Sequence, residues 1–221
     1  MSQELWKSVD QYFEGMLLPN DPVLDAAVRA SVDANLPPIA VSAMQGKLLH
    51  LLARAMNAKK ILEIGTLGAY STIWLGRALP PGGKLITLEV DAKHAAVARS
   101  NLVRAGLSDK VEVLLGSALD TLPKLATSGV GPFDLFFIDA DKPSNADYFT
   151  WAMKLSRPGS AIIVDNVVRK GAVIDAKSGD EDVRGVRRCV ELMNKEPRFS
   201  ATVIQSVGTK GYDGLIMGVV G

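Results

Sequence analysis

The chain has 221 residues, of which 48% are hydrophobic and 22% charged, and its formal net charge is +1 at pH 7. These values are typical of a globular protein of one domain, and so small a net charge provides no global field that would recruit nucleic acid or a membrane. The one cysteine, Cys189, excludes an internal disulfide and a multi-cysteine zinc site, and it fits a reducing compartment.

The N-terminal segment is expected to be helical. Apolar residues recur there at helical spacing and predict an amphipathic helix: Leu5, Trp6, Val9, Phe13 and Met16. A second helix is expected to begin after Asp21 and to end before Pro37, and a third to follow Ser42. We assign residues 1–57 to a helical extension that caps the domain or pairs two subunits, because its apolar stripe requires a cover.

The start of the chain also bears on location. Its first residues include acids and lack a long apolar stretch, so they do not predict a signal peptide. No segment is long and apolar enough to predict a membrane span. We therefore expect a cytoplasmic protein.

From residue 59 onward, apolar strands alternate with helices. Strands are predicted at 59–65, 84–90, 110–116, 133–141 and 160–167, with helices at 71–79, 92–106, 118–125 and 145–155. This alternation predicts an α/β fold with a parallel sheet covered by helices on both faces. The tail differs, because a helix at 183–193 is followed by two strands, 199–207 and 212–220, that are close enough to pair antiparallel at the sheet edge.

The first strand ends in a glycine turn, Glu63-x-Gly65-x-x-Gly68. Ligands of open α/β sheets bind at the carboxyl ends of strands, and a missing Cβ lets them approach the backbone. The pattern is not the dinucleotide fingerprint, and the carboxylate of Glu63 favours a ligand with a positive centre over a pyrophosphate. A plain structural strand-to-helix turn remains an equal alternative on this motif alone.

The next two strands end in further candidate ligands. Glu89 lies 24 residues after Gly65, where an acidic residue can bind ribose hydroxyls. Asp91 is interpreted only as the N-cap of the following helix. Ser117 and Ala118 follow the third strand, where they could contact the edge of an adenine ring. Ser117 is equally well explained as an N-cap.

Acidic and amide side chains end the fourth and fifth strands. Asp139 and Asp141 follow one strand, and Asp165 with Asn166 ends the other. If these strands are neighbours, Asp139, Asp165 and Asn166 converge, and clustered carboxylates require a partner. The set offers only oxygen ligands, which favours Mg²⁺, or else Mn²⁺ or Ca²⁺, over zinc.

The residues after the fourth strand leave alternatives open. Lys142 either removes a proton from a substrate hydroxyl or serves as an ion-pair partner. Asp141 is as well explained by a loop position or cap as by a function. Ser144 to Asp147 are interpreted as a capping box that opens the next helix.

Four motifs together resemble a known family: "LEIGTLGAYSTIWLGRAL", "LEVD", "FIDADK" and "VDNV". They are similar to class I S-adenosylmethionine (SAM)-dependent O-methyltransferases, and more narrowly to the cation-dependent branch with the catechol and caffeoyl-coenzyme A O-methyltransferases. The resemblance covers almost the whole chain, since "LPPIAVSAMQGKLLHLL" is similar to the family's N-terminal cofactor segment. It implies one SAM-dependent methyltransferase domain over 1–221, with a Rossmann-like, seven-stranded, mostly parallel sheet whose last strand is antiparallel, and a homodimer.

The resemblance also implies roles for residues. It assigns to the cofactor Val41, Glu63, Gly65, Thr66, Ser71, Glu89, Ala118 and Asp139. It assigns the divalent cation to Asp139, Asp165 and Asn166, and it makes Lys142 and Asp139 catalytic. One departure concerns the glycine turn, because relatives often have glycine before the tyrosine of "GYS", whereas here Ala69 precedes Tyr70.

The predicted function is methyl transfer from SAM to a hydroxyl of a small catechol-like or phenylpropanoid aromatic, with a divalent cation. Loop 167–185 and the helical extension are expected to form the acceptor wall. The alternatives are an O-methyltransferase of a modified tRNA uridine, which the low net charge disfavours, a dinucleotide dehydrogenase, which lacks its fingerprint here, and a non-catalytic binding module.

Overall fold

The computed structural model describes residues 2–221. Its helices are α1 Gln3–Leu17, α2 Pro22–Asp33, α3 Ala43–Ala55, α4 Tyr70–Ala78, α5 Ala92–Arg104, α6 Ala118–Ser128, α7 Asn145–Leu155 and α8 Glu181–Lys195, with short 3₁₀ segments η1 Lys142–Ser144 and η2 Arg169–Ile174. Its strands are β1 Lys60–Ile64, β2 Lys84–Glu89, β3 Val111–Leu115, β4 Leu135–Ile138, β5 Ala161–Asp165, β6 Phe199–Gly208 and β7 Gly211–Val220. The strands are ordered β3-β2-β1-β4-β5-β7-β6.

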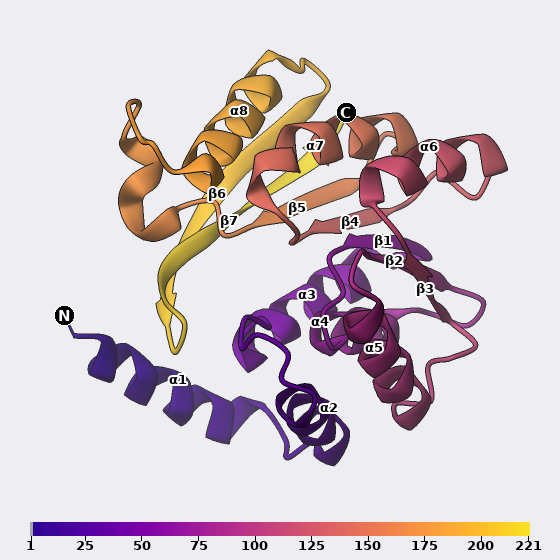
Figure 1. Ribbon diagram of the computed structural model, residues 1–221, viewed down its shortest axis with the longest axis vertical. Helices are drawn as coiled ribbons and strands as arrows, with labels where there is room; N and C mark the ends of the chain where they lie inside the picture. Colours follow the sequence, from indigo (N-terminus) through magenta and orange to yellow (C-terminus); the bar gives the residue numbers. More distant parts are fainter. Residues whose placement is uncertain (1) are drawn as a thin grey trace. The chain divides into compact units, whose positions relative to one another are not determined.

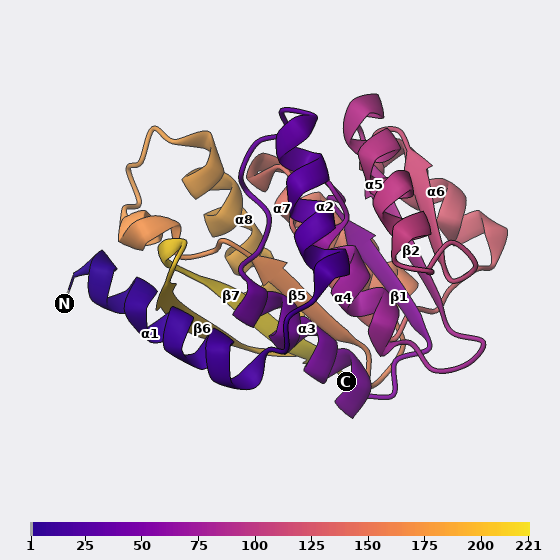
Figure 2. The same cartoon turned by 90° about the horizontal axis from the view of Figure 1, so that it is seen from below.

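Contacts along the chain define two compact units. One is Asp10–Thr121, and the other joins residues up to Val9 with Leu122–Gly221. In the unit Asp10–Thr121, β1 pairs with β2 and β2 with β3, all parallel. Helices α4 and α5 pack against these strands, and α2 packs on both helices (Figure 2). That unit therefore contains three consecutive strand-to-helix turns, including the predicted glycine turn.

The second unit carries the other four strands. β4 and β5 are parallel, and β7 runs antiparallel to both of its neighbours, β5 and β6. Helices α7 and α8 lie side by side over these strands (Figure 1). Because β7 is antiparallel to β5, the first residues of β7 lie beside the carboxyl end of β5, which matters for the site described below.

Burial of apolar strands accounts for this architecture. All residues of β4 and β5 are buried, as expected for parallel strands covered on both faces. The largest fully buried side chains include Phe136 and Phe137 on β4 and Phe149 on α7. Burying an aromatic or aliphatic side chain of this size contributes about 1.5–3 kcal/mol, so these faces hold helices and strands together.

The predicted α/β fold is confirmed, with its mostly parallel seven-stranded sheet, antiparallel last strand and N-terminal helices. The predicted amphipathic helix is present as α1, which contains all five of the apolar residues that predicted it, and none of its described residues is buried. The capping box was wrong in its chemistry: α7 begins at Asn145 as predicted, but the Ser144 side chain makes no cap hydrogen bond, since its backbone conformation (φ −92°, ψ 1°) is not the extended one that a cap requires.

Two further predictions have an outcome in the structure. Asp91 caps α5, where its carboxylate accepts hydrogen bonds from Lys93 N at 2.7 Å and His94 N at 3.0 Å. Among the helices of residues 2–221, none combines the length and apolar character that crossing a membrane requires. The assignment of 1–221 to one domain stays a prediction.

Candidate active site

A buried carboxylate marks the end of β1. Glu63 is 0% exposed, and it accepts hydrogen bonds from the hydroxyl of Ser71 at 2.6 Å and from that of Thr72 at 2.5 Å. Both hydroxyls lie in the first turn of α4, so the helix start is tied to the strand end. A buried carboxylate needs such donors to compensate its lost hydration, and the arrangement therefore fixes this carboxyl group within the turn.

The backbone of the turn takes conformations that side chains disfavour. Gly65 has φ 99°, while Leu67 and Ala69 have φ 49° and 66°. At Ala69, the left-handed conformation costs about 1–2 kcal/mol. Glycine at position 68 is favoured for a different reason, which is space: a Cβ there would lie 2.1 Å from Ser31 Oγ on α2. The left-handed conformation at Ala69 is thus held at a local energetic cost.

Glu89 at the end of β2 holds this turn in place. Its Oε2 accepts hydrogen bonds from Thr66 N at 3.2 Å and Leu67 N at 2.7 Å, and its Oε1 accepts one from Asp91 N at 3.0 Å. A carboxylate has about four acceptor positions on its two oxygens, so these three backbone hydrogen bonds do not use all the acceptor positions of Glu89, and a ligand hydroxyl could still donate to it. The ribose role of Glu89 stays a prediction, and the structure adds a role as anchor of the glycine turn.

The other predicted cofactor residues of this unit lie on the same or neighbouring segments. The hydroxyls of Thr66 and Thr87 are 2.6 Å apart, both buried. Val41 is buried directly before Ser42, the N-cap of α3, and Ala118 is the half-buried first residue of α6. Their contacts with a cofactor stay predictions.

The second cluster follows β4 and β5, which are neighbours, so the condition for the predicted convergence is met. Ile138 pairs with Val164, so the next residues along the two parallel strands are Asp139 and Asp165. Asp165 is only 4% exposed. Asn166 follows with φ 56°, a left-handed conformation that asparagine tolerates better than most residues, and its N–H donates to Asp165 Oδ1 at 2.8 Å.

Lys142 belongs to this cluster. The residue is 6% exposed, and its Nζ donates to Asp139 Oδ1 at 2.8 Å. Of the two roles left open by the sequence, the ion pair is present, and the role as a base stays a prediction. Asp141 accepts a hydrogen bond from the hydroxyl of Tyr148 at 2.5 Å, and burial together with this bond raises the pKa of Tyr148, so Asp141 anchors the start of α7.

The donor set fits a hard divalent cation. Asp139, Asp165 and Asn166 offer carboxylate and amide oxygens, the ligands that Mg²⁺ and Ca²⁺ prefer. Across residues 2–221, no three His, Cys, Asp or Glu side chains form a group that could hold a metal ion. The predicted set contains two carboxylates and an amide, so that finding does not bear on it.

The turn that carries Lys142 rests directly on α8. A Cβ at Gly185 would lie 2.2 Å from the carbonyl oxygen of Lys142 and 2.6 Å from the Cα of Pro143. These are backbone atoms, which cannot rotate away. Only glycine at position 185 therefore allows η1 and α8 to approach this closely.

We expect Gly185→Ala to lower both stability and activity. Overpacking costs about 1–3 kcal/mol, partly offset by alanine's better helix propensity of about 1 kcal/mol. A displaced Lys142 is expected to lower kcat about 10- to 100-fold, since misplacement by about 1 Å can cost that much. Urea unfolding and initial rates check this result. Gly179→Ala is the matched control, because a Cβ there meets nothing within 4 Å; equal effects of both changes would contradict the packing argument.

Several residues of the site escaped sequence interpretation. Thr72 and Thr87 are buried hydroxyls whose partners lie on other elements, and no spacing rule indicates such partners. Gly185 sits inside a helix, where a glycine signals close packing but not against what. Cys189 is buried, and burial raises the pKa of its thiol to about 12, so it does not supply a nucleophile.

Comparison with known proteins agrees with these motifs. The model of a family described as O-methyltransferase matches residues 17–217. The chain is 49% identical over 220 residues to a catechol O-methyltransferase of Niastella koreensis, covering 100% of both chains. It is 53% identical over 212 residues to a catechol O-methyltransferase of Mycobacterium tuberculosis, covering 96% of this chain and 94% of the relative.

Solved structures give the same result. An O-methyltransferase from Bacillus cereus, in complex with SAH, superimposes with a TM-score of 0.99 at 55% identity over 100% of both chains. An O-methyltransferase from Streptomyces achromogenes involved in tomaymycin synthesis, in complex with SAM, has a TM-score of 0.96 at 53% identity, covering 100% of this chain and 99% of the other. The chain therefore belongs to the O-methyltransferase family, the SAM-dependent class that its motifs resemble.

Proposed function

We propose that the chain is a divalent-cation-dependent O-methyltransferase that moves a methyl group from SAM to one hydroxyl of a small vicinal diphenol. The observation that carries the proposal is the oxygen cluster at the neighbouring ends of β4 and β5, with buried Lys142 paired to Asp139. Relatives about half identical to this chain are named catechol O-methyltransferases, which supports the acceptor class.

The donor would bind at the glycine turn. SAM carries a positively charged sulfonium, and Glu63 supplies a fixed negative charge held by two hydroxyls. Gly65 permits close approach of the ligand to the backbone, and Glu89 fixes the turn from behind. This arrangement suits a cationic ligand better than a pyrophosphate, which prefers bare N–H groups.

The acceptor would bind at the oxygen cluster. Asp139, Asp165 and Asn166 would hold the cation, which when bound orients the two diphenol oxygens and lowers the pKa of the reacting hydroxyl. Lys142 Nζ would then take the hydroxyl proton or stabilise the resulting oxyanion. In the transfer, a bond from the acceptor oxygen to the methyl carbon would form as the carbon–sulfur bond breaks, and the sulfur would leave as a neutral thioether. The chain's other contribution is positioning.

Chelation is the direct test of this function. We expect treatment with EDTA to lower methyl transfer to catechol at least about 100-fold, because the lost stabilisation of the oxyanion amounts to several kcal/mol. Added Mg²⁺ is expected to restore the rate. Products are measured by mass spectrometry after incubation with SAM and a panel of diphenols.

The acceptor panel contains its own control. Resorcinol and phenol match catechol in ring chemistry but lack two adjacent hydroxyls, so we expect them to react at a small fraction of its rate. Full activity in EDTA would remove the cation from the proposal, and equal rates for catechol and resorcinol would remove chelation of the acceptor. Methylation of bulk tRNA instead of any diphenol would favour the tRNA alternative.

The proposal includes a homodimer in the cytoplasm. Helix α1 presents an exposed apolar face that includes Leu5, Val9, Phe13 and Met16. Apolar faces of this extent are typical of protein interfaces, and the resemblance to cation-dependent O-methyltransferases implies a dimer. A second copy of this chain is the partner that we propose for it.

A further inference from the structure

The chain that leaves β5 takes an unusual backbone course. Within six residues, Asn166, Arg169 and Lys170 have φ values of 56°, 53° and 55°, and Gly171 has φ 90°. Arginine and lysine have no local means of favouring this left-handed conformation. Such a course persists only where surrounding groups hold it, and in enzymes it concentrates at functional sites. The segment begins at Asn166, a proposed ligand of the cation.

One side chain supplies most of this restraint. Asp213 Oδ1 accepts hydrogen bonds from Val168 N and Arg169 N, both at 3.0 Å, and from its neighbour Gly214 N at 2.9 Å. A further backbone bond joins Val167 N to Gly214 O at 3.0 Å. The backbone amides of Val167, Val168 and Arg169 are thus all hydrogen-bonded to residues at the start of β7.

Sheet topology explains why β7 can do this. Asp165 pairs with Leu215 across the antiparallel β5–β7 ladder, so Asp213 lies beyond the last residue of β5, beside the departing chain. Gly214 keeps the approach close, because a Cβ there would lie 2.8 Å from Val168 Cγ2 and 2.5 Å from Ile204 O. From the other side, Arg169 pairs with Asp182 of α8 at 2.7 Å.

We propose that Asp213 is a positioning residue of the acceptor side: by binding the amides of Val168 and Arg169, it fixes the backbone that presents Asn166 to the cation. The inference rests on the proposed function, in which Asn166 is a cation ligand. A carboxylate oxygen suits the task because it accepts several N–H groups at once. Partners that orient metal ligands in this way commonly govern affinity as much as the ligands do.

The test compares cation binding in the full chain with two substitutions. For Asp213→Ala we expect Mn²⁺, measured by calorimetry and by its electron paramagnetic resonance signal, to bind at least about 10-fold more weakly. Asp213→Asn keeps an accepting oxygen of the same reach, so its affinity for Mn²⁺ is expected to stay within about threefold. Hydrogen exchange at the amides of Val168 and Arg169 is expected to rise in Asp213→Ala and much less in Asp213→Asn.

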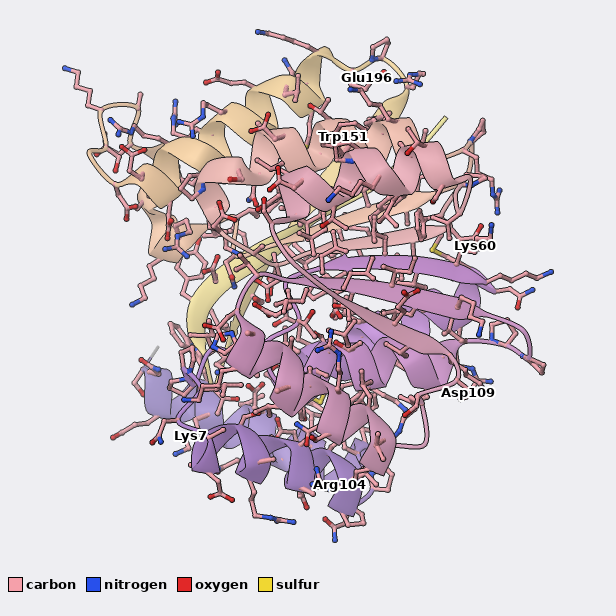
Figure 3. All side chains as sticks on the ribbon, turned by 45° about the vertical axis from the view of Figure 1, so that its right-hand side comes forward. Lys7, Lys60, Arg104, Asp109, Trp151 and Glu196 are labelled. Atoms are coloured by element: carbon pink, nitrogen blue, oxygen red, sulfur yellow. The ribbon has the colours of Figure 1, made fainter. Side chains whose placement is uncertain are left out.

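Glu196→Ala is the matched control in the same unit. Glu196 also binds a backbone amide, that of Arg198, but it lies in the turn between α8 and β6 (Figure 3). We expect this variant to bind Mn²⁺ like the parent protein. Equal losses in Glu196→Ala and Asp213→Ala would reduce Asp213 to a general structural role and overturn the inference.

Two other outcomes separate this inference from the proposed function. If Asp213→Ala binds Mn²⁺ with parental affinity, the inference is overturned while the cation site stays intact. The same holds if Asp213→Asn is soluble and binds Mn²⁺ with parental affinity although the amides of Val168 and Arg169 exchange freely. Absence of Mn²⁺ binding by the unaltered protein would overturn both. Kinetics separate an effect on the cation from an effect on the cofactor. Asp213→Ala is expected to raise the Mg²⁺ concentration for half-maximal rate, while the KM for SAM stays within about twofold of the parent value.

Discussion

Replacing Lys142 with methionine is expected to lower kcat for catechol methylation about 10²- to 10⁴-fold, the range in which positioned proton-transfer groups contribute. Methionine keeps the apolar length of the side chain but removes the ammonium that contacts Asp139. The affinity for SAM is expected to stay within about twofold, because the donor would bind at the glycine turn. Initial rates and calorimetric titration with SAM measure the two quantities separately.

Arginine at position 142 distinguishes the two roles of the lysine. It keeps a positive charge for the ion pair, yet it does not lose a proton near neutral pH and so cannot act as a base. Near-parental kcat in Lys142→Arg would establish the ion-pair role, and a loss equal to that of methionine would establish proton transfer. Lys154→Met on α7 is the control, since Lys154 is exposed and its Nζ lies 4.3 Å from the centroid of the Trp151 ring. Parental rates in Lys142→Met would refute either role.

Replacing Glu89 with alanine is expected to raise the Kd for SAM about 10- to 100-fold. The change leaves the amides of Thr66 and Leu67 without their acceptor, and each buried unpaired amide costs about 1–3 kcal/mol, with about 1.4 kcal/mol for each tenfold in affinity. The strained glycine turn then loses the group that holds it. Titration calorimetry with SAM and with SAH checks the result.

Two companions sharpen the Glu89 experiment. Glu89→Gln keeps one accepting oxygen but turns an NH₂ group toward Asp91 N–H, so an intermediate Kd is expected. Asp91→Ala removes a neighbouring carboxylate that only caps α5, and the Kd for SAM is expected to be unchanged. If Glu89→Ala binds SAM with parental affinity, neither a contact of Glu89 with the ribose nor its anchoring of the turn determines the affinity for the cofactor.

Sequence patterns predicted most of the fold because burial imposes them directly. The apolar runs of β4 and β5 predicted buried strands, and the Asp21, Ser42 and Asp91 caps form at the helix starts that the sequence indicated. The strand ends that bear Asp139 and Asp165 followed from the same alternation. Local pattern and tertiary structure agree in these places.

What the sequence did not reveal depends on contacts between distant segments. Asp213 lies 45 residues from Val168 N, and its role becomes visible only once β7 is known to run antiparallel beside β5. Gly185 indicates close packing by its place inside a helix, but its partner, the carbonyl oxygen of Lys142, lies on a segment about 40 residues earlier that no local pattern identifies. The Ser144 capping box failed for a local reason instead, because Ser144 is the last residue of the η1 turn, which sets its backbone conformation.

The order of these groups along the chain has a consequence for how such enzymes diversify. The side chains around the glycine turn come from residues 41–118, whereas the oxygen cluster, Lys142 and Asp213 all follow residue 138. In the proposed function, exchange or mutation of the C-terminal portion would therefore alter the oxygen cluster that binds the acceptor, while the residues assigned to the sulfonium donor, apart from Asp139, would be inherited unchanged. Recombination between paralogues at a point near residue 121 would then offer a simple genetic route to new acceptor preferences.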